Sequence, residues 1–79
     1  MPINILFFGA TAHVVGKNRI EMRHSTGTTS QMVFDQVKDK FPALCSHKLL
    51  YSVNQSYPAG DDIVRDGDEI AIFTAVSGG

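Results

Sequence analysis

One amphipathic helix, in a chain of only 79 residues, limits what this sequence can fold into. Apolar residues recur at helical spacing at Val33, Phe34, Val37 and Phe41, and charged residues between them fall on the other side. An apolar stripe of this kind must pack against another element. Because the chain offers no second helix of comparable length, the sequence predicts that a β-sheet covers the stripe.

Both ends of that helix carry local signals. Thr28 to Gln31 fits the capping box, in which Ser or Thr begins a helix and Glu or Gln follows three residues later. Pro42 stops the helix, because proline has no amide hydrogen to donate. We therefore expect the helix to begin near Thr28 and to end before Pro42.

Five short segments are candidate strands for the sheet. They are Ile3–Phe8, Arg19–His24, Leu49–Val53, a very short strand at Tyr57, and Ile70–Phe73. The first has Ile3, Ile5 and Phe7 on one side and Leu6 and Phe8 on the other, which suits a central strand. The second alternates between apolar and charged residues, which is typical of a strand with one wet face.

The segments between these strands predict tight connections. Gly9 to Gly16 has room for one helical turn, with Gly16 as a left-handed cap. Asn54-Gln55 and Asp66-Gly67 are turn signals, and Ile63-Val64 would cover the core. The element order predicts an α+β fold, a mixed sheet of about five strands packed on one main helix. We expect the first and last strands to lie together at the centre of the sheet.

Composition excludes several classes of protein. The net charge is −1 and no block of Lys or Arg occurs, so a nucleic-acid-binding surface is not expected. No apolar run approaches the roughly 20 residues of a membrane span, and the start of the chain lacks a basic secretion signal. Cys45, the one cysteine, has no partner for an internal disulfide. These features predict a cytoplasmic location.

The sequence ends in Gly78-Gly79, which follow a strand-like run, Glu69–Val76, after the single residue Ser77. Glycine has no Cβ, so a diglycine tail is thin and flexible and can enter a channel that other residues would block. We therefore expect residues 1–76 to form the domain and residues 77–79 to form a flexible tail. The chemistry that such a tail permits takes place on the terminal carboxylate of Gly79.

This order of elements, together with the tail, resembles the ubiquitin-like β-grasp and the small subunit of molybdopterin synthase, the MoaD family. The segments that carry the resemblance are Ile5–Phe8, Val15-Gly16, Val53–Gln55, Asp66–Ala71 and Val76–Gly79. The resemblance covers the whole chain. Two departures are Thr74-Ala75, where the family usually has two prolines, and Ala12-His13, where it often has an Arg-Glu pair.

The resemblance implies chemistry on Gly79 that is shared with larger proteins. A ubiquitin-activating-type adenylyltransferase would use ATP to convert the carboxylate to an acyl-adenylate, and a sulfur donor protein would then form a thiocarboxylate. The larger synthase subunit would transfer that sulfur to a pterin precursor, in a complex of two small and two large subunits. Gly78 would supply clearance for the tail, and the small subunit itself would bind no cofactor.

The resemblance also indicates a docking surface at the end of the last strand, with Phe73, Val76 and Ser77 as candidate partner contacts. Phe73 has an equal claim to be a core residue, since large apolar residues are mostly buried. A metal site is not expected, because the ligand spacing that zinc sites use does not occur. The potential ligands are His13, His24, His47 and Cys45.

Three other functions remain open on the sequence. One is a sulfur carrier for another product, such as the thiamine thiazole. Another is a ubiquitin-like modifier that forms an isopeptide bond through Gly79. The last is a β-grasp interaction module whose Gly-Gly end is incidental.

Overall fold

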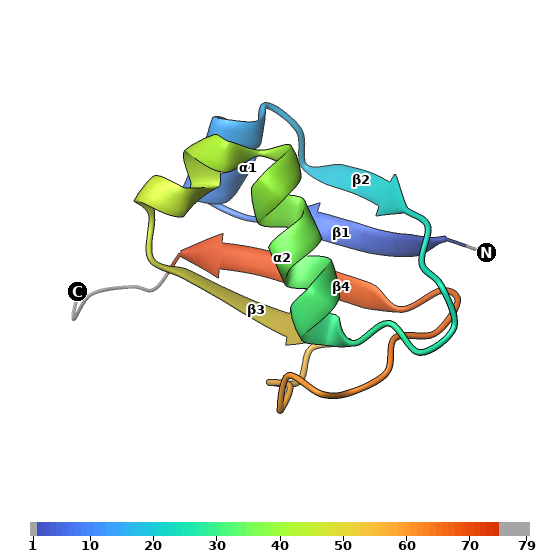
Figure 1. The fold of residues 1–79 in the computed structure, drawn as a ribbon. Coiled ribbons are helices and arrows are strands. Elements are labelled where there is room, and N and C mark those ends of the chain that lie inside the picture. Colours follow the sequence, from blue (N-terminus) through green and yellow to red (C-terminus); the bar gives the residue numbers. More distant parts are fainter. Residues whose placement is uncertain (1, 75–79) are drawn as a thin grey trace.

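A computed structural model describes residues 2–74 of the chain. Its elements follow the order β1 (Ile3–Phe7), α1 (Ala10–Val15), β2 (Arg19–Met22), α2 (Ser30–Lys40), the 3₁₀ helix η1 (Pro42–Ser46), β3 (Leu49–Val53) and β4 (Glu69–Thr74). Figure 1 shows α2 crossing one face of a single sheet, with α1 near the end toward which β4 runs. The expected division between domain and tail lies outside the described residues.

The sheet has the strand order β2-β1-β4-β3. β1 and β4 are parallel neighbours at its centre, and β2 and β3 are antiparallel strands at its edges. The expectation that the first and last strands lie together is thus confirmed. β1 pairs Ile5 with Ile70 and Phe7 with Ile72, so that alternate apolar residues of both central strands face α2.

The core lies between the sheet and α2. Its buried residues are Ile3, Ile5, Phe7, Val33, Phe34, Val37, Leu44, Val64, Ile70 and Ile72. Burial of each of these large aliphatic or aromatic side chains contributes about 1.5–3 kcal/mol. Phe34 also stacks on Tyr51 of β3, with ring centroids 4.5 Å apart. The predicted helical stripe therefore does pack on the sheet.

The start of α2 differs by one residue from the capping box expected at Thr28. Thr29 is the N-cap, and its hydroxyl accepts a hydrogen bond from the Met32 amide at 3.2 Å. The Thr28 hydroxyl is already used in the preceding turn, where it accepts from the Ser25 amide. At the other end, Phe41 caps α2 and Pro42 begins η1, so the predicted stop is confirmed.

Two strand boundaries also differ from expectation. β2 ends at Met22 rather than His24, because Met22 already pairs with Ile3, the first residue of β1. No strand forms at Tyr57 within the described residues. Asn54 and Gln55 both have left-handed backbone angles and turn the chain so tightly that Ser56 bonds back to Val53 as an isolated bridge. The sheet therefore has four strands where about five were expected.

The long loop before β4 is fastened to the start of α2. Ser30, which is fully buried, donates its hydroxyl to an Asp62 carboxylate oxygen at 2.7 Å, and its amide donates to the Asp62 carbonyl at 2.8 Å. Val64 packs into the core as expected. Ile63 does not, because it bridges to Thr29 and leaves 51% of its surface exposed.

The Ser30–Asp62 contact predicts an acid-sensitive component of stability. The hydrogen bond from Ser30 lowers the pKa of Asp62, so the folded protein binds that proton less tightly than the unfolded chain. The stabilisation is complete above the ordinary Asp pKa of about 4 and is lost as pH falls through the lower value of the folded state. We expect urea unfolding at a series of pH values to show that the free energy of unfolding falls less steeply below about pH 5 in Ser30→Ala than in the unmodified protein.

Asp61→Asn is the matched control for that experiment, because Asp61 is an exposed neighbour in the same loop. It should keep the pH dependence of the unmodified protein. If the free energy of unfolding depended on pH equally in Ser30→Ala and the unmodified protein, the Asp62 carboxylate would not contribute to the acid sensitivity of stability.

Candidate functional site

The face of the sheet away from α2 is open over its central and β3 strands. In β1, Ile3, Ile5 and Phe7 are buried, whereas Leu6 is half-buried and Phe8, just beyond the strand, is 52% exposed. The second apolar side of β1, which the sequence placed at Leu6 and Phe8, therefore remains uncovered by the described chain. Exposed apolar patches of this kind mark interaction sites.

A shallow groove of about 320 Å³ lies on this open face. Its lining residues are Leu6, Phe8, Ser52, Gln55, Glu69, Ala71 and Phe73. Leu50, which is 42% exposed, pairs with Phe73 across the β3–β4 ladder and extends the apolar surface toward the edge of the sheet. The lining is thus mainly apolar, with polar groups toward the start of β4.

Phe73 belongs to this groove and not to the core. Ile70 and Ile72 of β4 are fully buried beneath α2, and the side chains of a strand alternate between its two faces. Phe73 therefore points to the open face beside Phe8 and Ala71 and remains half-buried. Its position removes the core alternative, while its contact with a partner stays a prediction.

The open face becomes polar toward β2. Arg19 of β2 donates to the Asn4 side-chain oxygen of β1 at 2.9 Å, and the two residues lie on opposite strands near the groove edge. At the start of β4, the Asn54 side chain accepts from the Glu69 amide at 3.0 Å and donates to Asp68 at 3.1 Å. These contacts hold the turn that borders the groove.

The groove extends to the end of β4. Phe73 and Thr74 are the last two residues of that strand, and the chain continues from there toward the diglycine. The other predicted site residues, Val76, Ser77, Gly78 and Gly79, lie outside the described residues.

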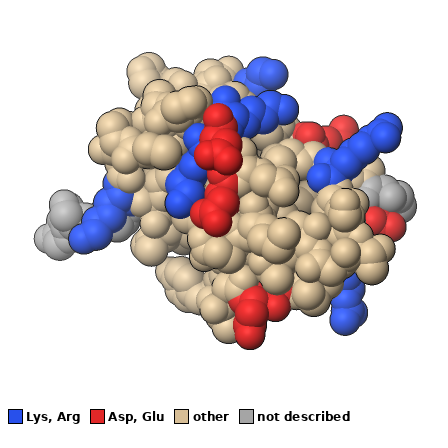
Figure 2. Space-filling model, viewed as in Figure 1, with Lys and Arg blue, Asp and Glu red and all other residues tan. Residues whose placement is uncertain are grey.

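The α2 side of the molecule differs from the open face. Figure 2 shows positive and negative residues interspersed over this side. On α2, Lys38 pairs with Asp35 at 3.3 Å and also lies over the Phe34 ring. This arrangement is typical of a solvated helix surface, where such pairs contribute little to stability.

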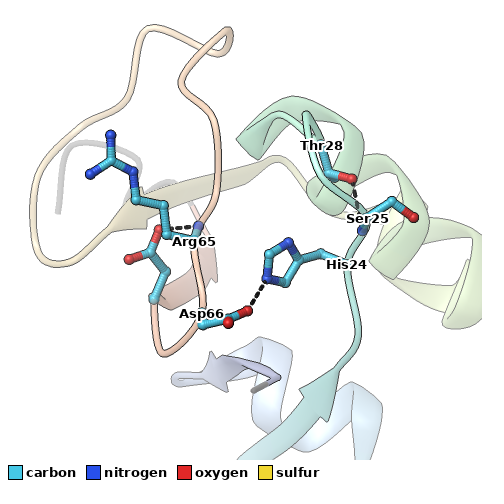
Figure 3. A network of polar contacts seen from close by, with 6 residues as sticks. His24, Ser25, Thr28, Arg65 and Asp66 are labelled. Atoms are coloured by element: carbon cyan, nitrogen blue, oxygen red, sulfur yellow. Dashed lines mark hydrogen bonds and ion pairs between the residues drawn. The ribbon is translucent and has the colours of Figure 1, made fainter.

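A polar pair that the sequence did not predict links two distant connections. His24, after β2, and Asp66, before β4, point toward each other, with His24 Nε2 2.8 Å from a carboxylate oxygen (Figure 3). The hydrogen bond with His24 lowers the pKa of Asp66. Nearby, Thr28 accepts from the Ser25 amide and Asp68 accepts from the Arg65 amide, so both connections are braced internally.

Other chemistry-bearing residues do not gather into a site in the described part of the chain. Within residues 2–74, no three His, Cys, Asp or Glu side chains come close enough together to hold a metal ion. Cys45 is a free thiol exposed on η1. No helix among these residues is long and apolar enough to cross a membrane.

The family model described as "ThiS family" matches residues 5–79, which is nearly the entire sequence. The chain belongs to the ThiS family. Curated relatives named molybdopterin synthase sulfur carrier subunit match over comparable lengths. The one from Mycobacterium tuberculosis is 32% identical over 100% of this chain and 99% of its own length. The one from Haemophilus influenzae is 35% identical over 98% of this chain and 99% of its own. The resemblance to the MoaD family is thus confirmed.

Solved structures confirm the ubiquitin-like β-grasp fold of this ThiS-family protein. A putative molybdopterin converting factor subunit 1 from Pyrococcus furiosus has a TM-score of 0.87 at 16% identity, over 96% of this chain and 99% of that one. SAMP1 from Haloferax volcanii has a TM-score of 0.86 at 22% identity, over the whole of both chains. At these identities the likeness establishes the fold.

The open-face residues were only partly accessible to sequence reasoning. Phe73 was singled out through the family resemblance, and Leu6 and Phe8 through the two-sided pattern of β1. Leu50 and Ala71 were not singled out for the site. Their signal is alternation, because Ala71 falls opposite the buried residues of β4, and Leu50 falls opposite the residues of β3 that are partly buried against the core.

Proposed function

We propose that this protein is a sulfur carrier that acts as the small subunit of a molybdopterin synthase. The observation that carries the proposal is the full-length match to relatives of that name, in a chain that ends in Gly78-Gly79. The apolar groove beside the end of β4 supports it, since a carrier must dock on other proteins.

The reacting atoms are those of the Gly79 carboxylate. In the first step a carboxylate oxygen attacks the α-phosphorus of ATP in an adenylyltransferase of the ubiquitin-activating type, and pyrophosphate leaves. In the second step a hydrosulfide equivalent from a sulfur donor protein attacks the acyl carbon, and AMP leaves with the former carboxylate oxygen. The product is a thiocarboxylate, a soft nucleophile that can pass its sulfur to a pterin precursor.

The division of labour follows from the size of the domain. A chain of 79 residues must use its apolar residues for one core and one docking face, which leaves little for a walled pocket. The ATP site and the pterin pocket would therefore belong to partners. The larger synthase subunit would bind the open face and receive the tail, in an assembly of two small and two large subunits located in the cytoplasm.

The mass of the intact protein and the position of any sulfur at its C-terminus test this function. When it is isolated from cells that contain the activating and sulfur-donating proteins, intact mass spectrometry should show one oxygen replaced by sulfur, and fragmentation should place the change on Gly79. A stable complex with a larger pterin-binding subunit is the second expected result.

Other outcomes would identify the alternatives. A partner that forms the thiamine thiazole would replace molybdopterin synthesis as the function. Conjugates between Gly79 and target lysines, without sulfur on the terminus, would indicate a ubiquitin-like modifier. If neither sulfur nor conjugates were found, the protein would be an interaction module, and the proposed function would be wrong.

A further inference from the structure

The Thr11 hydroxyl joins the connection after β1 to the end of β4. Thr11 lies in the first turn of α1 and is fully buried. Its Oγ1 lies 2.9 Å from the Ile72 carbonyl oxygen, 61 residues away in sequence. It also lies 2.7 Å from the Phe8 carbonyl oxygen and accepts from the Phe8 amide at 3.0 Å. The hydroxyl, whose one hydrogen faces both carbonyl oxygens, therefore contacts the backbone of β4 and of the residue that follows β1.

The backbone before α1 is shaped to make these contacts possible. Gly9 has φ +58°, a left-handed value that other residues rarely adopt. This turn returns Thr11 to Phe8, and the Thr11 amide donates to the Phe8 carbonyl at 3.2 Å. The Phe8 amide in turn is shared between the Thr11 hydroxyl and the Ile72 carbonyl, which lies 3.1 Å away.

The backbone groups that the hydroxyl contacts belong to the groove residue Phe8 and to Ile72, the residue before Phe73. Phe8 is bound directly, through its amide and its carbonyl. The Ile72 carbonyl is part of the planar peptide unit that leads into Phe73, so its orientation fixes where the Phe73 nitrogen and Cα lie relative to it. Phe8 and Phe73 both line the groove on the open face, whereas Thr11 itself is buried out of reach of a partner.

The sequence after Ile72 contains no proline that would stiffen the backbone. The three prolines are Pro2, Pro42 and Pro58, so no ring fixes φ anywhere between Ile72 and Gly79. The contacts described near the end of β4 therefore bear on how that end of the strand is held. The Thr11 hydroxyl is placed for this, because its bond to Ile72 lies two residues before the strand ends.

We propose that Thr11 is a positioning residue, which holds Phe8, Phe73 and the end of β4 in the geometry that a partner recognises. The functional part of this inference rests on the proposed sulfur-carrier function. The structural part does not, because it concerns only the hydrogen bonds between α1 and the two central strands.

Three variants separate positioning from a general contribution to stability. Thr11→Val keeps the shape of the side chain and removes the hydroxyl. Thr11→Ser keeps the hydroxyl and should restore its effect. Val64→Ala is the control, because it removes buried methyl groups in the loop before β4 and destabilises the core away from Thr11.

The first readout is amide hydrogen exchange followed by NMR on the full chain. In Thr11→Val we expect the Phe8 amide to exchange roughly three- to tenfold faster relative to the Ile5 and Ile70 amides, which corresponds to the loss of about one net hydrogen bond. Thr11→Ser should lie within about twofold of the unmodified protein. Val64→Ala should change the exchange rates of all three amides by a similar factor.

The second readout is the affinity for the larger synthase subunit, measured at a temperature where each variant is fully folded. Thr11→Val should weaken binding roughly three- to tenfold, whereas Thr11→Ser and Val64→Ala should stay within about twofold of the unmodified protein. Equal effects of Thr11→Val and Val64→Ala in both readouts would overturn the inference, as would failure of Thr11→Ser to restore them.

The two readouts keep this inference distinct from the proposed function. If the unmodified protein neither carries sulfur nor binds the larger subunit, the proposed function fails, and the Phe8 exchange result alone decides the role of Thr11. If Thr11→Val does not fold, Thr11→Cys takes its place. Its thiol is a weaker donor than a hydroxyl. We therefore expect the Phe8 amide to exchange faster than in Thr11→Ser and more slowly than by global unfolding.

Discussion

Removal of Gly78 and Gly79 is expected to abolish sulfur loading and to leave the fold intact. The deletion leaves the carboxylate on Ser77, two residues short of its position in the full chain, so the terminal carbon should no longer reach a partner's active site and the loss of loading should be complete. The core is built from residues between Ile3 and Ile72, so thermal unfolding should change by no more than about 2 °C. The measurements are intact mass after incubation with the activating and sulfur-donating proteins, and calorimetry of the same sample.

Gly79→Ala is the matched control for this deletion. It keeps the full length of the tail and adds one methyl group, so it separates the loss of reach from the loss of clearance. We expect it to fold normally and to be loaded more slowly than the unmodified chain, because a Cβ widens the tail. Full sulfur transfer from the truncated protein would sink the proposed chemistry, and a strong drop in thermal stability would show that the tail packs on the domain.

Much of the fold could be predicted from hydrophobic patterns that allow only one arrangement of the elements. The stripe through Val33 and Val37 needs an apolar partner surface, and the chain has only its strands to offer. The two-sided apolarity of Ile3–Phe8 places that strand at the centre. Thr28 and Thr29 show where such reasoning ends. Only Thr28 has Gln three residues later, yet Thr29 is the N-cap, because the Thr28 hydroxyl is engaged in the turn with Ser25.

The candidate site was less accessible, because composition does not say what covers an apolar face. Apolar residues at Leu6 and Phe8 are compatible with a strand that its own chain covers on both sides. They are equally compatible with a strand that leaves one face for a partner. Only the position of α2 on one side of the sheet distinguishes these cases. The Thr11–Ile72 and His24–Asp66 contacts join residues 61 and 42 positions apart, and no local pattern predicts them.

Phe73→Ala is expected to weaken binding to the larger subunit by roughly 30-fold or more. A half-buried aromatic that lines an apolar groove has the features of an interface hot spot, where truncation costs about 2 kcal/mol or more. The same change should have a modest effect on folding, because Phe73 lies on the open face and outside the core. Binding isotherms and thermal unfolding of the variant test both parts.

Tyr57→Ala is the matched control, since it also replaces an exposed aromatic with alanine. Tyr57 is 79% exposed, is not part of the groove lining, and lies in the loop after β3. It should bind as the unmodified protein does. Equal losses from Phe73→Ala and Tyr57→Ala would mean that the partner does not use the open face as its main contact. Normal binding by Phe73→Ala with loss in Tyr57→Ala would move the docking surface to that loop. Loss of binding in Phe73→Ala alone would show that the partner contacts the groove next to the end of β4 at Thr74.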